Sequence, residues 1–177
     1  MEAIYAVDLS NGLSRQGIIP WKLKKDMLFF MNKTKNNIVI MGKNTYFSIP
    51  QENRPLKNRF NIVLTSNPQL FHTHNNSNVL FTSDSNIYQD ILENKKQYYE
   101  KYNYLHEDFK IFIIGGKNIY EQFIPLCNTV WITHIHFNYE CDLFMDNKYL
   151  IEFQENIYEE NEQLKIMVYK RLKKNIL

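Results

Sequence analysis

A single acidic residue, Asp26, lies among apolar side chains in a segment that should form a helix after Pro20 and Trp21. The apolar positions recur every three or four residues, which is the spacing of one helical face: Leu23, Met27, Phe30 and Thr34. Burial raises the pKa of a carboxyl group and a positively polarised ligand lowers it. Asp26 is therefore suited to binding an amidine-like edge and assisting proton delivery. An acid that only complements the helix dipole is the alternative, and position alone does not exclude it.

Two turns that contain glycine follow apolar runs. Gly115 and Gly116 come directly after residues 111–114, and Gly42 after residues 38–41, with Lys43 and Thr45 close behind. Glycine lets a ligand approach the backbone, and the start of a helix supplies free N–H groups for a phosphate. Each turn alone could be a plain strand-to-helix connection, since neither matches a GxGxxG fingerprint or a Walker loop. Together with Asp26, the two turns favour an enzyme that uses a long anionic nucleotide cofactor.

Short apolar runs alternate with helix-like segments along the chain. Strands are expected at residues 4–7, 38–41, 62–64, 79–81, 111–114 and 130–132. Helices are expected at residues 23–33, 44–48, 87–102 and 118–123, with Ser or Asp near several starts as candidate caps. Residues 152–158 and 164–172 predict a terminal antiparallel pair around an acidic turn at 159–162, and residues 71–78 the loosest region. The pattern predicts one α/β domain over residues 1–177 with a mixed sheet.

The composition narrows the class of protein. Of the 177 residues, 44% are hydrophobic and 15% aromatic, which is enough for one substantial core. Acidic Glu2 and Asp8 are unlike a signal peptide, and no apolar run approaches the roughly 20 residues of a spanning helix. We therefore expect a cytoplasmic protein that binds no membrane. A net charge of only +2 argues against nucleic-acid binding and favours a small anionic ligand.

Cysteine and histidine are placed neither as a disulfide scaffold nor as a metal site. Cys127 and Cys141 lack CxxC spacing and a catalytic Cys motif, so we expect ordinary buried or half-buried thiols. His134 and His136 alternate onto one strand face, a geometry that could hold a metal ion, but no third ligand is evident. No metal is expected.

Five motifs, in this order and spacing, resemble those of the dihydrofolate reductase family: IPWKLKKD, VIMGKNT, SIPQENRPLKNRFNIVLTS, IIGGKNIYEQF and ITHI. They cover nearly the whole chain. The resemblance implies a central, mostly parallel eight-stranded sheet with flanking helices and an antiparallel C-terminal strand pair. It also implies an oxidoreductase that reduces 7,8-dihydrofolate to 5,6,7,8-tetrahydrofolate with NADPH, supports one-carbon metabolism and thymidylate synthesis, and binds antifolates. A monomer is the expectation that comes with the family.

The resemblance implies roles at the substrate end of the cleft. Asp26 would hold the 2-amino group and N3 of the pterin and assist protonation at N5. Thr133 would hydrogen-bond there as well, and Trp21 would hold an ordered water near the acid. Arg59 would pair with the glutamate carboxylate of the substrate. The pocket walls would be Ile4, Met27, Phe30, Ile49 and Leu56, with Ile114 and Tyr120 lining the site where the two rings stack.

The resemblance also implies roles at the cofactor end. The nicotinamide would adjoin Ala6, Leu13 and the loop through Gly17 to Ile18. The pyrophosphate and ribose would adjoin Gly115, Gly116, Lys117, Asn118, Ile119, Tyr120 and Gln122. The adenosine end would adjoin Gly42, Lys43, Asn44, Thr45, Leu64, Thr65 and Ser66.

Three features depart from the family pattern. Ser14 stands where the family usually has glycine in the loop over the nicotinamide, which could alter how this loop closes. No arginine lies near the expected 2′-phosphate, which leaves Lys43 as the principal cation there. The segment at 82–109 is longer than in short bacterial members, and a solvated surface helix is expected in it.

Two rival functions differ in their sequence requirements. Another pterin or pyrimidine reductase of the same fold, such as the riboflavin-pathway reductase, does not account for Asp26 after Pro-Trp together with Arg59. A non-catalytic folate- or RNA-binding descendant of the fold would not need the acid, Thr133 and both glycine turns, which are all present.

Overall fold

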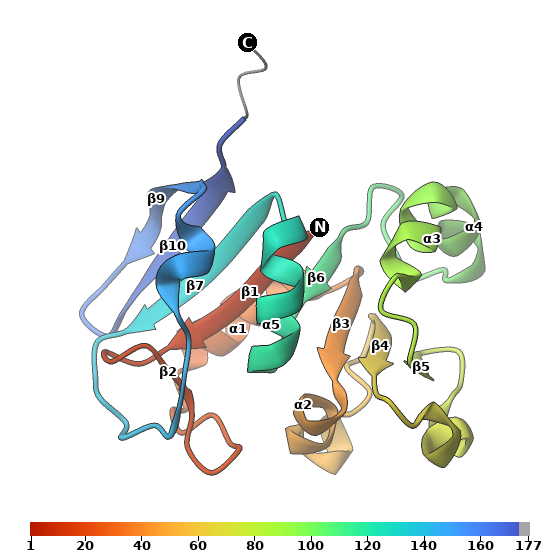
Figure 1. Ribbon diagram of the computed structural model, residues 1–177, viewed down its shortest axis with the longest axis horizontal. Helices are drawn as coiled ribbons and strands as arrows, with labels where there is room; N and C mark the ends of the chain where they lie inside the picture. Colours follow the sequence, from red (N-terminus) through yellow and green to blue (C-terminus); the bar gives the residue numbers. More distant parts are fainter. Residues whose placement is uncertain (174–177) are drawn as a thin grey trace.

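The chain forms eight strands that pair in a single sheet. In this computed structural model, which describes residues 1–173, these strands are β1 (Glu2–Val7), β3 (Ile38–Gly42), β4 (Phe60–Leu64), β5 (Val79–Thr82), β6 (Ile111–Ile113), β7 (Thr129–Ile135), β9 (Phe153–Glu160) and β10 (Leu164–Arg171). Their order across the sheet is β5-β4-β3-β6-β1-β7-β10-β9 (Figure 1). A separate short pair joins β2 (Gly12–Ser14) to β8 (Leu143–Phe144).

The helices are short apart from the first. The α-helices are α1 (Lys24–Thr34), α2 (Lys43–Ser48), α3 (Ile87–Glu93), α4 (Lys95–Lys101) and α5 (Lys117–Phe123). The 3₁₀ helices are η1 (Gln51–Asn53), η2 (Pro68–His74), η3 (Ile124–Leu126) and η4 (Asn147–Leu150). In the part of the chain that the structure describes, no helix is long and apolar enough to cross a membrane.

The order in which the strands are added to the sheet reverses beside β1. The chain leaves β1, builds β3, β4 and β5 outward, and then returns to insert β6 between β3 and β1. All neighbouring pairs from β5 to β7 are parallel, whereas β10 is antiparallel to β7 and to β9. Ligands of open α/β sheets bind at the carboxyl ends of the strands where the order reverses. The predicted mostly parallel sheet with an antiparallel C-terminal pair is confirmed.

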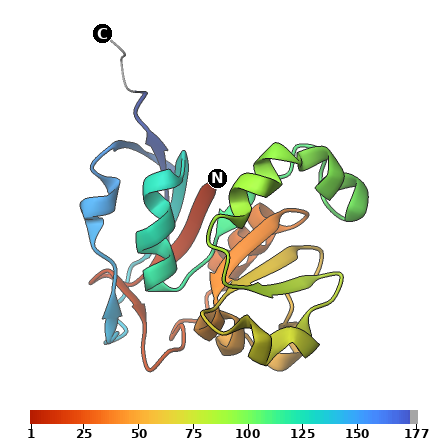
Figure 2. The same cartoon turned by 45° about the vertical axis from the view of Figure 1, so that its right-hand side comes forward.

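Burial on both faces explains why the central strands are almost entirely apolar. In β3, Ile38 and Ile40 belong to one core cluster, and Val39 and Met41 belong to the other. All four side chains have 0% exposure. The first cluster includes Tyr120 and Phe123 of α5. Residues of α1 and α2 pack on the second, and the two figures show α1 and α5 on opposite faces of the sheet (Figures 1 and 2). This arrangement is why a period-2 alternation is invisible in these strands.

Several expected local features are wrong. The single helix predicted at 87–102 is two helices, because Asn94 adopts φ −113° and ψ 30° and ends α3 before α4 begins. No side chain caps the start of any α-helix in residues 1–173, so the expected Ser and Asp caps are absent; glycine precedes both α2 and α5. A glycine there leaves the first N–H groups open to a ligand.

The C-terminal hairpin and the Asn-rich stretch also differ from expectation. Strand β9 continues through Glu159 and Glu160, which form ion pairs with Lys25 and Lys165, so the turn begins only at Asn161. The stretch at 71–78, expected to be loose, starts inside η2, where the ring of Phe71 stacks on that of Phe81 with their centroids 5.0 Å apart. In both places, tertiary contacts that local sequence does not reveal extend the ordered structure.

Candidate active site

The two glycine turns lie side by side at the carboxyl ends of β3 and β6. The amide of Gly42 donates to the carbonyl oxygen of Gly115 at 2.7 Å. A Cβ on Gly116 would lie 3.1 Å from the hydroxyl oxygen of Thr45, and a Cβ on Gly42 would lie 3.2 Å from Ile119. Side chains at these glycines would be crowded, and the hydrogen bond places the two turns next to each other.

Gly115 also makes room for the ring of Tyr120. Its φ is +115°, in the region that favours glycine, and a Cβ would lie 3.1 Å from that ring. The Tyr120 hydroxyl donates to the carbonyl oxygen of Ile4 at 3.0 Å, which ties α5 to β1. The Gly115-Gly116 peptide bond is cis. Burial raises the pKa of Tyr120 well above its ordinary value, so its hydroxyl stays protonated.

Asp26 projects from the first turn of α1 beneath an indole ring. The indole N–H of Trp21 donates directly to Oδ2 of Asp26 at 3.2 Å, a contact that the sequence suggested only through a water. Burial raises the pKa of the Asp26 carboxyl, and the Thr133 hydroxyl and the Trp21 indole partly oppose that rise. No ion pair involves Asp26 within residues 1–173. The carboxylate is thus desolvated, oriented, and without a cation.

The residues expected to wall the pocket come from several segments and, apart from Met27, share one core cluster. Ile4 of β1 and Ile114 after β6 are buried, with 3% and 8% exposure. Phe30, Ile49 and Leu56 are partly buried and pack on the same core cluster as these two. The predicted buried stripe of α1 is wrong at Met27, which is 57% exposed, whereas Thr34 is buried. Met27 therefore contributes nothing to the core and is free to contact a ligand.

Arg59 carries a buried guanidinium group that no carboxylate neutralises. Its Nε donates to the Thr34 hydroxyl at 2.8 Å, and its terminal nitrogens donate to the carbonyl oxygens of Lys57 at 2.7 Å and Met31 at 3.1 Å. The residue is only 6% exposed, and its burial lowers the pKa of the guanidinium from the ordinary value. Within residues 1–173 it forms no ion pair. An anionic ligand would supply the missing charge.

A cavity of about 240 Å³ opens at the ends of β4 and β5. It is lined by Leu64, Thr65, Ser66, Ser83, Ser85, Ile119 and Gln122. Five of these seven were expected at the cofactor end, and Ser83 and Ser85 were missed. Their signal was available, because they follow β5, the strand that lies next to β4 in the parallel sheet. Lys43 is exposed and lies over the ring of Phe71, so it does not line this cavity.

Comparison with known proteins decides the family. The family model described as dihydrofolate reductase matches residues 1–172. Two dihydrofolate reductases are 32% identical to this chain: that of Ureaplasma parvum over 149 residues (84% of this chain and 83% of the relative) and that of Drosophila melanogaster over 150 (80% and 76%). A solved structure of the Enterococcus faecalis dihydrofolate reductase, complexed with NADP(H) and RAB-propyl, superposes with a TM-score of 0.71. It has 28% identity and covers 96% of this chain and 95% of that one. This chain belongs to the dihydrofolate reductase family.

Family membership confirms the motif-based prediction of an NADPH-dependent dihydrofolate reductase of this fold. Some relatives are longer: this chain spans 28% of the bifunctional dihydrofolate reductase-thymidylate synthase of Daucus carota.

The loop between Gly12 and Trp21 accommodates the departure from the family pattern at Ser14. Ser14 pairs with Leu143 in the β2–β8 ladder and does not have a positive φ, so it adopts a backbone conformation that does not require glycine. The positive φ values in this loop belong to Gln16 and Gly17, at +50° and +75°. Leu13 is buried at 9% exposure, whereas Ile18 is 64% exposed. The effect of Ser14 on how the loop closes stays a prediction.

The two thiols lie as the sequence suggested. Cys127 and Cys141 are free and buried, as predicted. His134 is partly buried, which lowers the pKa of its imidazole, and Nδ1 of His136 contacts the carbonyl oxygen of Glu162 at 3.1 Å. Over the described residues, no group of three or more His, Cys, Asp or Glu side chains is placed to hold a metal ion.

Proposed function

We propose that this chain reduces 7,8-dihydrofolate to 5,6,7,8-tetrahydrofolate, with Asp26 as the group that holds the pterin and supports protonation at N5. The single observation that carries this proposal is the environment of Asp26. Its carboxyl is desolvated, receives the indole N–H of Trp21 and has no cation of its own within residues 1–173. Two parallel N–H donors of a ligand, such as an amino group and a ring N–H, match a carboxylate in a bidentate pair.

The glycine turns and the cavity at β4 and β5 have the features that NADPH requires. When bound, NADPH supplies the hydride that reduces C6 of the pterin. Gly42, Gly115 and Gly116 leave no space for side chains, which lets a pyrophosphate approach the backbone. Hydroxyls of Thr65, Ser66, Ser83 and Ser85 in the cavity are available to a 2′-phosphate. Among residues 1–173, no lysine, arginine or histidine lines this cavity, so we infer that preference for NADPH over NADH rests on hydroxyls.

The remaining residues act by position. The raised pKa of Asp26 keeps a proton available nearer neutral pH than an exposed aspartate would. Trp21 and Thr133 fix the direction of the carboxyl, and Ile4, Phe30, Ile49 and Ile114 exclude water from the ring. Arg59, with its uncompensated charge, pairs with the carboxylate of the substrate's glutamate. Aligning the two rings in this water-excluding cleft contributes much of the rate.

The cellular setting of this activity is also a proposal. We infer that the chain acts as a cytoplasmic monomer on small molecules, including antifolates, and contributes to one-carbon metabolism. The net charge of +2 supports the absence of a nucleic-acid partner. Sedimentation equilibrium at micromolar concentration measures the oligomeric state, and a dimer there contradicts this part.

Loss of absorbance at 340 nm with dihydrofolate tests the reaction, with NADPH and NADH compared at equal concentration. We expect turnover with NADPH, and a loss of roughly 10²- to 10⁴-fold in Asp26→Asn near neutral pH, because general acid catalysis contributes on that order. Asp90→Asn is the matched control, since Asp90 accepts hydrogen bonds on the surface of α3 and should leave the rate unchanged. A folded wild type that binds both ligands without turnover contradicts the proposal and favours a binding module.

A further inference from the structure

A second carboxylate, Asp8, lies just after β1 and is stabilised by hydrogen bonds from backbone amides and from the thiol of Cys141. Its Oδ1 accepts the amides of Ser10 at 2.9 Å and Gly12 at 2.8 Å, and its Oδ2 accepts the amide of Tyr139 at 3.0 Å. Asp8 is 1% exposed, and it forms no ion pair within residues 1–173. A buried charge is costly unless it is fully hydrogen-bonded. This carboxylate therefore links two loops that are about 130 residues apart in the sequence.

The residue that Asp8 holds from the distant loop is in contact with the active-site indole. The Tyr139 ring lies against the Trp21 ring, with centroids 5.6 Å apart and an interplanar angle of 58°. Trp21 is only 5% exposed, and its N–H reaches Asp26. The contacts thus run without a gap from the Asp8 carboxylate through the Tyr139 backbone and ring to Trp21 and then to Asp26. The Tyr139 hydroxyl forms no hydrogen bond among the described residues. Tyr139 therefore contacts Trp21 through its ring alone.

We propose that Tyr139, anchored by Asp8, is a positioning residue that holds the Trp21 indole against Asp26. Its action on the reaction rests on the function proposed above. The hydrogen bond from the indole N–H stabilises the charged carboxylate and so lowers the pKa of Asp26. If the indole can turn away, this stabilisation is lost and the pKa of Asp26 rises further under desolvation. Two titratable neighbours stay neutral at pH 7, because burial raises the pKa of Tyr120 well above its ordinary value and that of Cys141 to about 11. The charged groups on the same loops are Asp8, Asp142 and the exposed pair of Arg15 with Glu140.

The test compares Tyr139→Ala with Tyr139→Phe, and follows the Asp26 titration in the ligand-free protein by carboxyl ¹³C NMR. We expect Tyr139→Ala to raise the pKa of Asp26 by roughly half to one unit, as for loss of one hydrogen bond to a charged acceptor. Tyr139→Phe should leave it unchanged, since it keeps the ring. Phe137→Ala is the matched control: Phe137 is 63% exposed, and its ring contacts Tyr139 at 5.0 Å but not Trp21.

Kinetics give a second readout. If the protonated carboxyl is the active form, the rate falls as pH rises through the Asp26 pKa, so Tyr139→Ala moves that falling limb to higher pH by the same amount. Asp8→Asn, which keeps the size but loses an acceptor, should move it in the same direction by less.

An unchanged Asp26 titration in folded Tyr139→Ala overturns the proposal, as does a Tyr139→Phe variant that behaves like Tyr139→Ala. Should Tyr139→Ala fail to fold, Tyr139→Leu keeps apolar bulk without the ring face, and the same two readouts decide. A wild type without turnover would defeat the proposed function, yet the NMR titration would still decide whether Tyr139 positions Trp21.

Discussion

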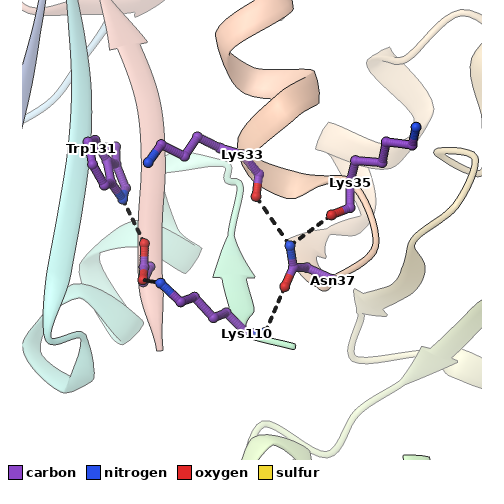
Figure 3. Close-up of polar contacts among 6 residues, drawn as sticks. Lys33, Lys35, Asn37, Lys110 and Trp131 are labelled. Atoms are coloured by element: carbon purple, nitrogen blue, oxygen red, sulfur yellow. Dashed lines mark hydrogen bonds and ion pairs between the residues drawn. The ribbon is translucent and has the colours of Figure 1, made fainter. Parts of the chain in front are cut away.

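Two carboxylates in this molecule each receive the N–H of a tryptophan indole, at opposite ends of the parallel strands. At the carboxyl ends, Trp21 donates to Asp26 at 3.2 Å, and within residues 1–173 no cation forms an ion pair with Asp26. At the amino ends, Trp131 donates to Glu2 at 2.6 Å, and the ammonium of Lys110 donates to the other oxygen at 2.6 Å. Figure 3 shows Trp131 and Lys110 converging on this carboxylate, with the Lys33 ammonium beside the Trp131 ring.

The two carboxylates differ in how the protein itself balances their charge. Glu2 is 8% exposed, and both of its oxygens have a partner from the protein itself. A polar hollow of about 190 Å³ beside it contains Lys33 and Lys110 as well as Glu2 and Asp108, so its charges largely balance. Asp26 has only neutral partners. A carboxyl group without a cation, at the ends of the strands where ligands bind, is a candidate ligand site, whereas Glu2, whose charge Lys110 balances, has a structural role.

The largest expected effect on stability is at Glu2, whose charge is balanced by Lys110. Glu2→Gln keeps one acceptor oxygen, so either the buried Trp131 N–H or Lys110 loses its partner. We expect the free energy of unfolding to fall by about 1–3 kcal/mol. Urea unfolding measures this, with turnover expected to stay within twofold of wild type.

Glu100→Gln is the control for Glu2→Gln, because it breaks an exposed ion pair with Lys96 on one helix and should cost less than about 0.5 kcal/mol. Equal losses in the two variants would show that the Glu2 pair behaves as a surface pair.

Much of the Asp26 site was predictable from the sequence because its signals are local. The acid in the α1 pattern, Gly115-Gly116 after an apolar run and Gly42 before Lys43 are each read within one segment. The Glu2 end was not predicted. Glu2 and Lys110 are 108 residues apart, and nothing near either residue indicates the partner. The same holds for Asp8 and Tyr139, which are joined only by the packing of two loops.

The prediction of the fold likewise succeeded where the signal is local and failed where it is not. Central strands such as β3 were predicted within about one residue, because burial on both faces demands continuous apolar runs. The β2–β8 pair and the break at Asn94 were missed, since a two- or three-residue ladder has no periodicity and Asn is tolerated inside a helix. Sequence patterns thus identify elements whose core burial is extensive, and they fail where a few hydrogen bonds decide.

A smaller effect is expected in how the stability of variants at Asp26 and Asp8 depends on pH. Burial raises the pKa of Asp26, so the folded state holds the proton more tightly and wild type gains stability as pH falls toward about 4. Asp26→Asn should therefore be more stable than wild type at pH 7, by about 1 kcal/mol, with the gain shrinking in acid.

Desolvation tends to raise the pKa of Asp8, but the amides of Tyr139, Gly12 and Ser10 outweigh it and the pKa is lowered. The charge on Asp8 thus stabilises the folded state above the unfolded pKa, and this contribution is lost as pH falls through the lower folded pKa. Asp8→Asn should be less stable than wild type at pH 7, and this deficit should also shrink in acid. Urea unfolding of both variants at pH 7 and at pH 3, below the unfolded aspartate pKa of about 3.9, measures the two signs and their loss in acid. Deviations of the same sign at pH 7 would contradict the distinction between the two carboxylates.

The smallest effect concerns Lys33, whose ammonium lies 3.6 Å from the centroid of the Trp131 ring. A cation over an indole contributes about 0.5–1 kcal/mol at exposed sites, but burial lowers the pKa of this ammonium, so desolvation offsets part of that gain. Lys33→Met keeps the packing of the stem and should change the free energy of unfolding by less than about 0.5 kcal/mol. In the Glu2→Gln background the nearby negative charge is gone and Lys110 still repels Lys33, so the same substitution should become stabilising. A double-mutant cycle by urea unfolding measures this change of sign; additive effects would mean that Lys33 is no part of the balance that makes this end of the sheet structural.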